Sequence, residues 1–477
     1  MIGWIILALV LALAAVVIIR TLRFKPAERK AVSAENIEFD RKKVVDSLSQ
    51  LIRCKTVSHD DHSLEDDAEF EKLYALLPKL YPNVYSACEK IEISDRALLF
   101  KWSGRDSSEA SVLMAHFDVV PVDEKNWEKP AFEGIIEDGV LWGRGSIDTK
   151  VTFNSVLSAA DHLIAQGFVP EQDIYMAFSG GEEIDGPGAG LIVDYLQKNN
   201  VKLSMVLDEG GAVVDDVFPG VDEPCALIGI AEKGKMNVEY SIESDGGHAS
   251  APKPHTPVGK LSLACTKLEA HPFTARFNGP AMQMLDTLGR HSTFVYKMIF
   301  ANLWLFKGVL DAVCKKSGGE LNALIRTTVA FTQMEGSDAP NVIPPSAKMV
   351  SNIRLAPGDT VESALDYIKK TISDDDIKIS ALVPAEPSAI SRTDCAGWNR
   401  IVNAVEATWR GAIVSPYLMV QCSDSAKYSP ISDRVYRFCG IDMTAEERHS
   451  IHGNNEKIRV EAVERCMEFY IRVIKQC

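Results

Sequence analysis

The chain has 477 residues, of which 46% are hydrophobic and 25% are charged. This length predicts two or three domains, and the composition is that of a globular protein, which excludes wholesale disorder. The formal net charge of −15 argues against a general nucleic-acid-binding protein, because such proteins carry a basic surface.

The first segment, residues 2–19 (IGWIILALVLALAAVVII), contains no charged side chain. At about 1.5 Å per residue, a helix of this length spans roughly 27 Å, close to the hydrocarbon core of a bilayer. We therefore expect an uncleaved transmembrane anchor over residues 1–24 and a charged linker over residues 25–40. The alternative is a cleaved signal peptide with a cleavage site at residues 12–14, but no basic residue precedes the apolar run.

Basic residues follow the apolar segment: Arg20, Arg23, Lys25, Arg29 and Lys30. Positive charge after the span favours a cytoplasmic location for the rest of the chain, and hence a single-pass membrane protein. The ten cysteines form no CxxC pair, and no Asn-x-Ser/Thr acceptor site occurs in the chain. Both observations agree with a cytoplasmic or bacterial setting.

From residue 41 to residue 231, helical and strand-like patterns alternate. Helical spacing covers residues 41–53, 67–81 and 150–166, and apolar strands include SVLMAHFDVV, DIYMAFSG and SMVLDEG. This alternation predicts an α/β domain with a mixed, mostly parallel sheet between helices.

The pattern changes over residues 232–387. Strands at 235–244, 326–333, 348–354 and 377–383 are interrupted by one helix after Pro257 and another at 360–373. This βαββαβ-like order predicts an inserted α+β domain with an antiparallel sheet. The α/β pattern returns over residues 388–477, so the α/β domain would be discontinuous.

Four successive strand ends or adjoining loops carry an imidazole or a carboxylate: His116 with Asp118, Asp148, Glu182 with Glu183, and Asp208. His116 and Asp118 share a face of their strand, so the carboxylate can orient a metal-binding histidine. Ligands in open α/β sheets sit at the carboxyl ends of strands. Each of these residues also has an ordinary structural explanation: His116 could be a hydrogen-bonded histidine, Asp148 could cap the following helix, and the other acids could be solvated. These explanations do not account for the presence of all of them at successive strand ends.

The segment 115–150 (AHFDVVPVDEKNWEKPAFEGIIEDGVLWGRGSIDTK) resembles the signature of the zinc-dependent aminoacylase/carboxypeptidase metallohydrolases. The likeness extends over nearly all of residues 40–475. It is nearest the carboxypeptidase S and N-fatty-acyl amino acid hydrolase branch, through NALIRTTVAFTQ, NVIPPSAK and IHGNNEKI.

The resemblance implies two Zn²⁺ ions per chain, with Mn²⁺ or Co²⁺ as substitutes. By motif position the metal ligands would be His116, Asp148, Glu183, Asp208 and His452, with Asp148 bridging both ions. Asp118 would orient His116, and Glu182 would be the general base. Two close cations lower the pKa of a bridging water and polarise the substrate carbonyl, while Glu182 carries the water proton to the leaving amine.

In the inserted domain, the resemblance implies that His248 (GGHAS) reaches a catalytic site, commonly that of the partner subunit, and stabilises the oxyanion. A homodimer through this lid and dimerisation domain is therefore expected. Asn341 and Arg354 resemble positions that hold the substrate carbonyl and carboxylate, with Arg326 as the rival carboxylate binder.

Three other histidines compete with these residues. His449 lies beside His452, and His59 and His62 lie in a polar loop; we interpret all three as surface residues. The chain also departs from its relatives at Gly181, where many have Asp, and at Cys422, where glycine is usual. No member of the family needs a covalent step, so a nucleophilic role for Cys422 is not expected.

Residues 294–310 (FVYKMIFANLWLFKGVL) are an unusually apolar insert. They could pack in a core or dimer interface, or they could form a wall for an acyl chain or a contact with the bilayer.

The expected activity is hydrolysis of the amide bond of N-acyl amino acids or peptides next to a free carboxylate, and in reverse the condensation of fatty acids with amino acids. The alternatives are a dipeptidase or aminopeptidase of the same family, and a catalytically inactive membrane-tethered binding protein.

Overall fold

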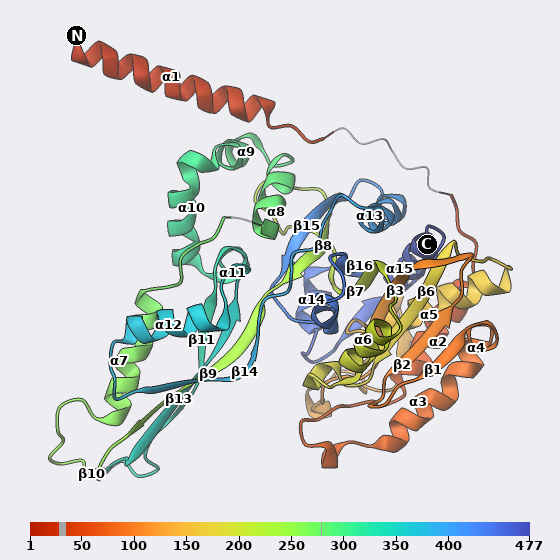
Figure 1. Cartoon of the computed structure of the whole chain (residues 1–477), viewed down its shortest axis with the longest axis horizontal. Coiled ribbons are helices and arrows are strands. Elements are labelled where there is room, and N and C mark those ends of the chain that lie inside the picture. Colours follow the sequence, from red (N-terminus) through yellow and green to blue (C-terminus); the bar gives the residue numbers. More distant parts are fainter. Residues whose placement is uncertain (28–34, 278) are drawn as a thin grey trace.

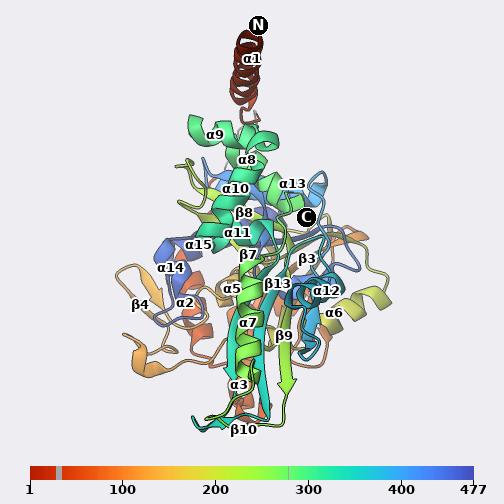
Figure 2. The ribbon, with the colours of Figure 1, turned by 90° about the vertical axis from the view of Figure 1, so that its left-hand side faces the viewer.

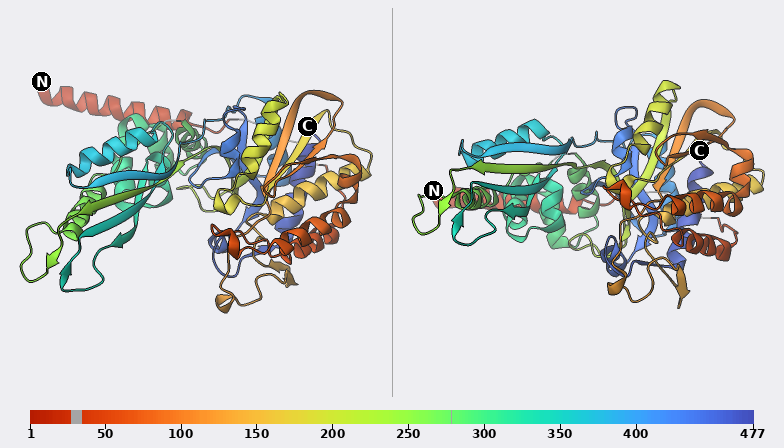
Figure 3. Two further views of the ribbon diagram at one scale, coloured as in Figure 1. Left: turned by 60° about the horizontal axis from the view of Figure 1, so that its bottom comes forward. Right: turned by 90° about the horizontal axis from the view of Figure 1, so that it is seen from below.

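The computed structural model describes residues 1–27, 35–277 and 279–477, which form an apolar helix and two lobes (Figure 1). Residues 28–34 of the predicted linker lie outside the described residues. Figure 3 shows the two lobes lying side by side with thin connections between them.

The larger lobe is built on an eight-stranded sheet. In spatial order its strands are β1 (Glu89–Glu92), β2 (Leu98–Trp102), β6 (Gln172–Ser179), β3 (Asp106–His116), β7 (Leu203–Val214), β16 (Val435–Met443), β8 (Cys225–Glu232) and β15 (Ile413–Met419). Strand β3 pairs in parallel with β6 and β7, β16 with β7, and β15 with β8, whereas β1–β2, β2–β6 and β8–β16 are antiparallel. The predicted mixed, mostly parallel sheet is confirmed.

Helices cover both faces of this sheet. One face packs against α5 (Lys150–Ala165) and α15 (Val460–Ile474), with α2 (Arg41–Ile52) outside them, and the other packs against α6 (Gly188–Lys198). In β3, Leu113 contributes to the first core and Val112 to the second, as the alternation of a strand requires. Because the sheet, α2 and α15 all contact α5, this helix is buried on nearly all sides, which explains its apolar sequence.

The remaining elements of this lobe surround the sheet and the helices named above. They are α3 (Asp67–Leu80), α4 (Pro82–Ala87), α13 (Ala396–Thr408), α14 (Ala445–Ser450) and the short helices η1 (His62–Leu64), η2 (Glu124–Asn126), η3 (Glu182–Ile184) and η4 (Asp424–Tyr428). A small antiparallel sheet joins β4 (Ile135–Glu137), β5 (Val140–Trp142) and β17 (Lys457–Arg459). This small sheet brings the loop before α5 next to the loop after α14.

The smaller lobe contains a four-stranded antiparallel sheet in the order β11 (Thr328–Glu335), β13 (Ser346–Leu355), β9 (Gly234–Glu243) and β14 (Lys378–Ala385). Helices α7 (Pro257–Ala270) and α12 (Val361–Ile372) share a separate hydrophobic core with it. The order along the chain is β-α-β-β-α-β, as the sequence pattern indicates. A two-stranded ribbon of β10 (Gly247–His248) and β12 (Val342–Ile343) forms the far tip of this lobe (Figure 1).

Four helices interrupt this order: α8 (Gly279–Gly289), α9 (Phe294–Ala301), α10 (Leu303–Ser317) and α11 (Gly319–Ile325). Helix α8 packs on β15, and Met284 and Leu288 belong to the core of the larger lobe. Residues 279–289 therefore lie within the range predicted for the inserted domain but contribute to the core of the larger lobe. Helices α9 and α10 instead expose large apolar side chains, including Val295, Trp304 and Val309.

The N-terminal helix α1 (Ile2–Arg23) is long and apolar enough to cross a membrane. It projects from the body and contacts it at its last turns, beside α9 (Figures 1 and 2). At this contact Asn302 Nδ2 donates to the main-chain oxygen of Val17 and to Thr21 Oγ1, both at 3.3 Å. The apolar helix α1 is therefore adjacent to the exposed apolar side chains of α9.

Candidate active site

Acidic and imidazole side chains gather at the carboxyl ends of the central strands. His116 ends β3, Glu182 and Glu183 lie in η3 directly after β6, and Glu209 lies within β7. Asp148 comes from the loop before α5. Parallel strands end at the same edge of a sheet, so residues distant in the sequence meet there.

Asp148 lies between two imidazoles. Its Oδ1 is 3.2 Å from His116 Nε2, and its Oδ2 is 3.0 Å from His452 Nε2. Glu183 approaches His452 Nε2 at 3.1 Å on one side, and Glu209 approaches His116 Nε2 at 3.4 Å on the other. A carboxylate that presents one oxygen to each half of a cluster has the arrangement of a bridging ligand between two cations.

The structure corrects the expectation for Asp208. Its Oδ2 accepts a hydrogen bond from the main-chain nitrogen of Ser425 at 2.9 Å, and the neighbouring Glu209 faces His116. Successive side chains of a strand point to opposite faces, so only one member of this acidic pair can join the cluster. The DEG triplet in the sequence contains both candidates, and the structure distinguishes them.

Asp118 contacts both His116 and the glutamate pair, Glu182 and Glu183. Its main-chain oxygen is 3.0 Å from His116 Nδ1, and its carboxylate oxygen Oδ1 is 3.4 Å away. The same carboxylate accepts the main-chain N–H groups of Glu182 at 3.1 Å and Glu183 at 3.2 Å. With Nδ1 donating to Asp118, Nε2 of His116 keeps its lone pair for a metal ion.

Glu456 was not singled out from the sequence, although it holds the loop that carries Asp148. This buried carboxylate pairs with Arg144 Nη1 at 2.6 Å and accepts main-chain N–H groups of Gly145, Ile147 and Asp148 at 2.7–3.1 Å. The only sequence signal is its position four residues after His452, which periodicity does not distinguish from a surface acid.

In a single chain, the residues of the smaller lobe that were predicted to contact the substrate do not lie at the metal-binding cluster. His248 is exposed in the β10–β12 ribbon at the far tip, and Asn341 adjoins it, accepting the main-chain N–H of Ala249 at 3.0 Å (Figure 1). Arg354 lies nearer, since its Nη1 donates to Cys422 Sγ at 3.2 Å. Arg326 is buried and paired with Asp311, so it is not available as the rival carboxylate binder.

Of the competing histidines, His449 and His62 are exposed and hydrogen-bonded within their own segments, to Ala445 and Glu65 respectively. Burial raises the pKa of the Cys422 thiol, which disfavours the nucleophilic thiolate.

Residues 112–476 match the peptidase family M20/M25/M40. The chain belongs to this family. It is therefore a metallohydrolase of the M20 group, and the enzyme class expected from the sequence is confirmed.

Several M20 relatives resemble the chain along nearly its whole length. It is 34% identical to the N-fatty-acyl-amino acid synthase/hydrolase PM20D1 of Xenopus tropicalis, covering 97% of this chain and 92% of that protein. It is 30% identical to the probable carboxypeptidase S-like 2 of Dictyostelium discoideum, covering 98% and 92%. The M20 metallo-carboxypeptidase Sso-CP2 of Sulfolobus solfataricus shares the fold with a TM-score of 0.66 at 18% identity, covering 91% of this chain and 98% of that one.

The electrostatics of the M20 site fit a cation-binding role. Burial and the charge of Asp148 raise the pKa of Glu209 to about 8, and burial raises the pKa of Glu182 well above its ordinary value. Hydrogen bonds to Asp148 and Glu183 raise the pKa of His452 to about 10. The cluster thus concentrates more negative charge than its imidazoles offset, and divalent cations would relieve the repulsion.

Proposed function

We propose that the protein is a two-metal amidohydrolase that cleaves the amide bond of N-acyl amino acids or peptides next to a free carboxylate. The observation that supports this proposal most directly is the position of Asp148 between His116 and His452. The names of the relatives, a fatty-acyl amino acid hydrolase and a carboxypeptidase S-like protein, agree with it.

The donor set suits two zinc ions, or manganese or cobalt in their place. From the distances around the two imidazoles, His116, Asp148 and Glu209 would hold one ion, and Asp148, Glu183 and His452 the other. When bound, the ions would lower the pKa of a water molecule and polarise the substrate carbonyl.

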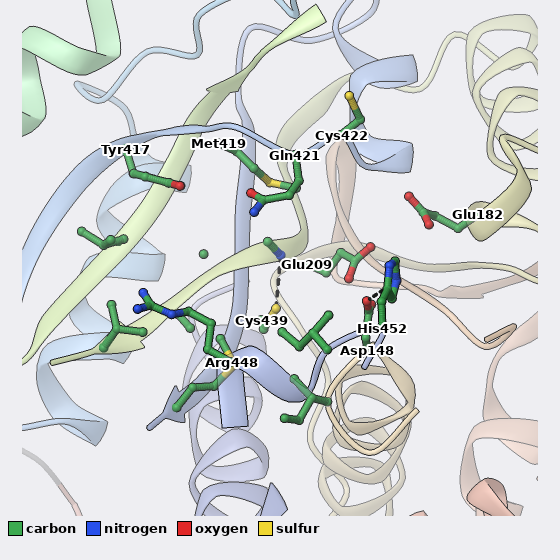
Figure 4. A pocket seen from close by; sticks show the side chains of 18 of the residues that line it. Asp148, Glu182, Glu209, Tyr417, Met419, Gln421, Cys422, Cys439, Arg448 and His452 are labelled. Atoms are coloured by element: carbon green, nitrogen blue, oxygen red, sulfur yellow. Dashed lines mark hydrogen bonds and ion pairs between the residues drawn. The ribbon is translucent and has the colours of Figure 1, made fainter. Parts of the chain in front are cut away.

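Glu182 is the group best suited to move the proton. Its Oε2 is 4.0 Å from His116 Nε2, farther than the carboxylates proposed as ligands, and Figure 4 shows it across from Asp148 and His452. It would take a proton from water and deliver it to the leaving amine. Asp118 would keep Glu182 in place through its main-chain N–H.

The substrate carboxylate would bind Arg354, whose guanidinium group reaches the site at Cys422. His248 and Asn341 would contact the substrate after a large lid movement or from a second copy of the chain. A homodimer through the smaller lobe, with these two residues supplied by the partner subunit, is our proposal for completing the site.

Helix α1 would anchor the enzyme in a membrane, with the two lobes on the cytoplasmic side next to its basic residues. A membrane-held enzyme of this type would meet lipophilic substrates directly, and in reverse could condense fatty acids with amino acids.

The decisive test is hydrolysis of N-acyl amino acids and dipeptides by the purified protein, with and without a chelator. We expect release of free amino acid that stops with chelator and returns with Zn²⁺, and a loss of at least about a hundredfold in kcat for Glu182→Ala. Glu362→Ala, in the first turn of α12 of the smaller lobe, serves as the matched control. Full activity of Glu182→Ala would exclude the mechanism.

A further inference from the structure

The two imidazoles of the cluster have different surroundings. His116 lies at the buried end of β3, and its side chain is 2% exposed. The side chain of His452 is 53% exposed and lines a cavity of about 410 Å³ beside the cluster (Figure 4). His452 also has φ +58°, a backbone conformation that is uncommon for a residue with a side chain. The position of His452 therefore needs support from outside its own loop.

Each imidazole belongs to one half of the cluster, and the halves share one carboxylate. The His116 half consists of His116, Asp148 and Glu209, and the His452 half consists of Asp148, Glu183 and His452.

Arg144 supports the loop that carries His452. It precedes Asp148 in the loop between β5 and α5. Its Nη2 donates to the main-chain oxygen of Gly453, directly after His452, at 2.7 Å. Its Nη1 donates to Glu456 Oε2 at 2.6 Å. One guanidinium group thus holds the His452 loop at two points.

Main-chain contacts join the same two loops. The pairing of β5 with β17 continues beyond the strands, since the N–H of Gly143 donates to the main-chain oxygen of Glu456 at 2.9 Å. The carboxylate of Glu456 accepts the main-chain N–H of Asp148 at 3.1 Å. Arg144 and Glu456 together therefore set the position of Asp148 relative to His452.

The ion pair between Arg144 and Glu456 is enclosed. Their side chains are 3% and 0% exposed, and the ring of Trp127 lies 5.4 Å from Arg144 Cζ. Exposed ion pairs contribute little to structure, whereas removal of one partner from a buried pair leaves an uncompensated charge. The buried geometry fixes this pair, and with it the two loops that it joins.

We propose that Arg144 is a positioning residue for the ion bound in the His452 half, and that it acts through Gly453. The inference rests on the two-metal site of the proposed function and adds the residue that sets the affinity of its more exposed half. The other imidazole, His116, lies at the end of β3, so the ion bound there should depend much less on Arg144.

Lysine in place of Arg144 separates its two contacts. A single ammonium group can keep the ion pair with Glu456, but it lacks the fork that reaches Gly453 at the same time. Glu456 would still hold the Asp148 loop, so the His452 loop alone loses a contact. We therefore expect Arg144→Lys to weaken one zinc ion at least about tenfold and to change the other less than about twofold.

The test measures zinc dissociation constants of the metal-free full chain by competition with a chelator, without substrate. Arg144→Lys is combined with His116→Ala, which leaves the His452 half intact, and separately with His452→Ala, which leaves the His116 half intact. We expect zinc binding to weaken at least about tenfold in the first background and less than about twofold in the second. Glu456→Gln should weaken zinc in both backgrounds, because its carboxylate holds Asp148.

Arg465→Lys is the matched control, since Arg465 of α15 forms a bidentate pair with Asp442 of β16 in the same lobe. Thermal unfolding of each metal-free variant checks that it is folded. If Arg144→Lys does not fold, Arg144→Gln with Glu456→Gln leaves no unpaired charge and replaces it. Relative to Glu456→Gln alone, this double variant should weaken zinc further only in the His116→Ala background.

Equal weakening by Arg144→Lys in both backgrounds would overturn the inference, because it would indicate a general loss of structure. An unchanged zinc affinity in the His116→Ala background would also overturn it.

The number of zinc ions separates this inference from the proposed function. A chain that binds two zinc ions but hydrolyses no substrate would contradict the proposed function, while selective weakening by Arg144→Lys in that chain would still support the inference. Fewer than two ions in the unsubstituted chain would overturn the inference, whatever its activity.

Discussion

Single residues in this protein act mostly through neighbours that orient them. Asp118 contacts His116 and both members of the glutamate pair, so one buried carboxylate sets the positions of three groups at the cluster. Glu456 does the same for the loop that carries Asp148. Such supporting groups affect metal affinity nearly as strongly as the ligands themselves.

The choice between Asp208 and Glu209 can be tested directly. We expect Glu209→Gln to lower the metal content by about one ion per chain, because a neutral amide is a poor ligand for zinc. Asp208→Asn should keep the metal content, since the amide oxygen can still accept the N–H of Ser425. Metal-to-protein ratios of the purified variants measure this, and the reverse pattern would restore Asp208 as the ligand.

At the scale of elements, the helices between residues 279 and 317 occupy two environments. Helix α8 is packed into the catalytic core, whereas α9 and α10 expose a surface next to the last turns of α1 (Figure 2). An exposed apolar surface beside a helix long enough to span a bilayer is typical of a membrane contact.

We expect the full chain to remain with phosphatidylcholine vesicles after an alkaline wash, and a chain lacking residues 1–24 to bind them reversibly. In that shortened chain, Trp304→Ser with Val309→Ser should weaken vesicle binding at least about tenfold, because two exposed apolar side chains no longer enter the lipid. Leu382→Ser with Val383→Ser, exposed on β14, is the control pair. Equal losses for both pairs, measured by co-sedimentation, would remove α9 and α10 from the membrane contact.

At the scale of the whole molecule, the junction between the lobes is a buried polar region. Lys233 follows β8, and its Nζ donates to the main-chain oxygens of Ala323 at 3.1 Å and Arg326 at 2.9 Å. Burial, together with the charge of Arg354, lowers the pKa of Lys233 to about 7.

This lowered pKa has a consequence for stability. The unfolded lysine has a pKa of about 10.4, so between about pH 7 and pH 10 the folded state binds fewer protons than the unfolded state. The free energy of unfolding therefore rises with pH in this window, by up to about 1.4 kcal/mol per pH unit. Below about pH 7 the full cost of burying the charged lysine is present.

Lys233→Met should remove this part of the pH dependence of the melting temperature, whereas Lys378→Met, on an exposed lysine, should keep it. Equal slopes in both variants would contradict the assignment.

The proposed dimer makes a prediction about complementation. If His248 acts in the partner's site, Glu182→Ala and His248→Ala chains should both be inactive alone, and their co-expression should restore about a quarter of the activity. Half of the dimers would then be mixed, with one complete site in each. No recovery in a co-purified mixed dimer would mean that His248 acts within its own chain, if it acts at all.

The sequence by itself determined the local features of this protein. Strand and helix periodicity predicted the two kinds of sheet, and His116, Asp148, Glu183 and His452 could be named because each lies in a recognisable local string. The apolar N-terminal helix was equally visible. These features depend on residues close together in the chain, where the periods of strands and helices determine which side chains share a face.

The tertiary structure decided what depends on pairing between distant segments. The register of β7 placed Glu209 rather than Asp208 at the cluster, and the pairing of β5 with β17 brought Glu456 under the Asp148 loop. The cavity beside the cluster is lined by residues of four strands and of α11. The physical reason is that burial, charge and shape at these points are properties of surfaces assembled from remote residues, which local periodicity does not encode.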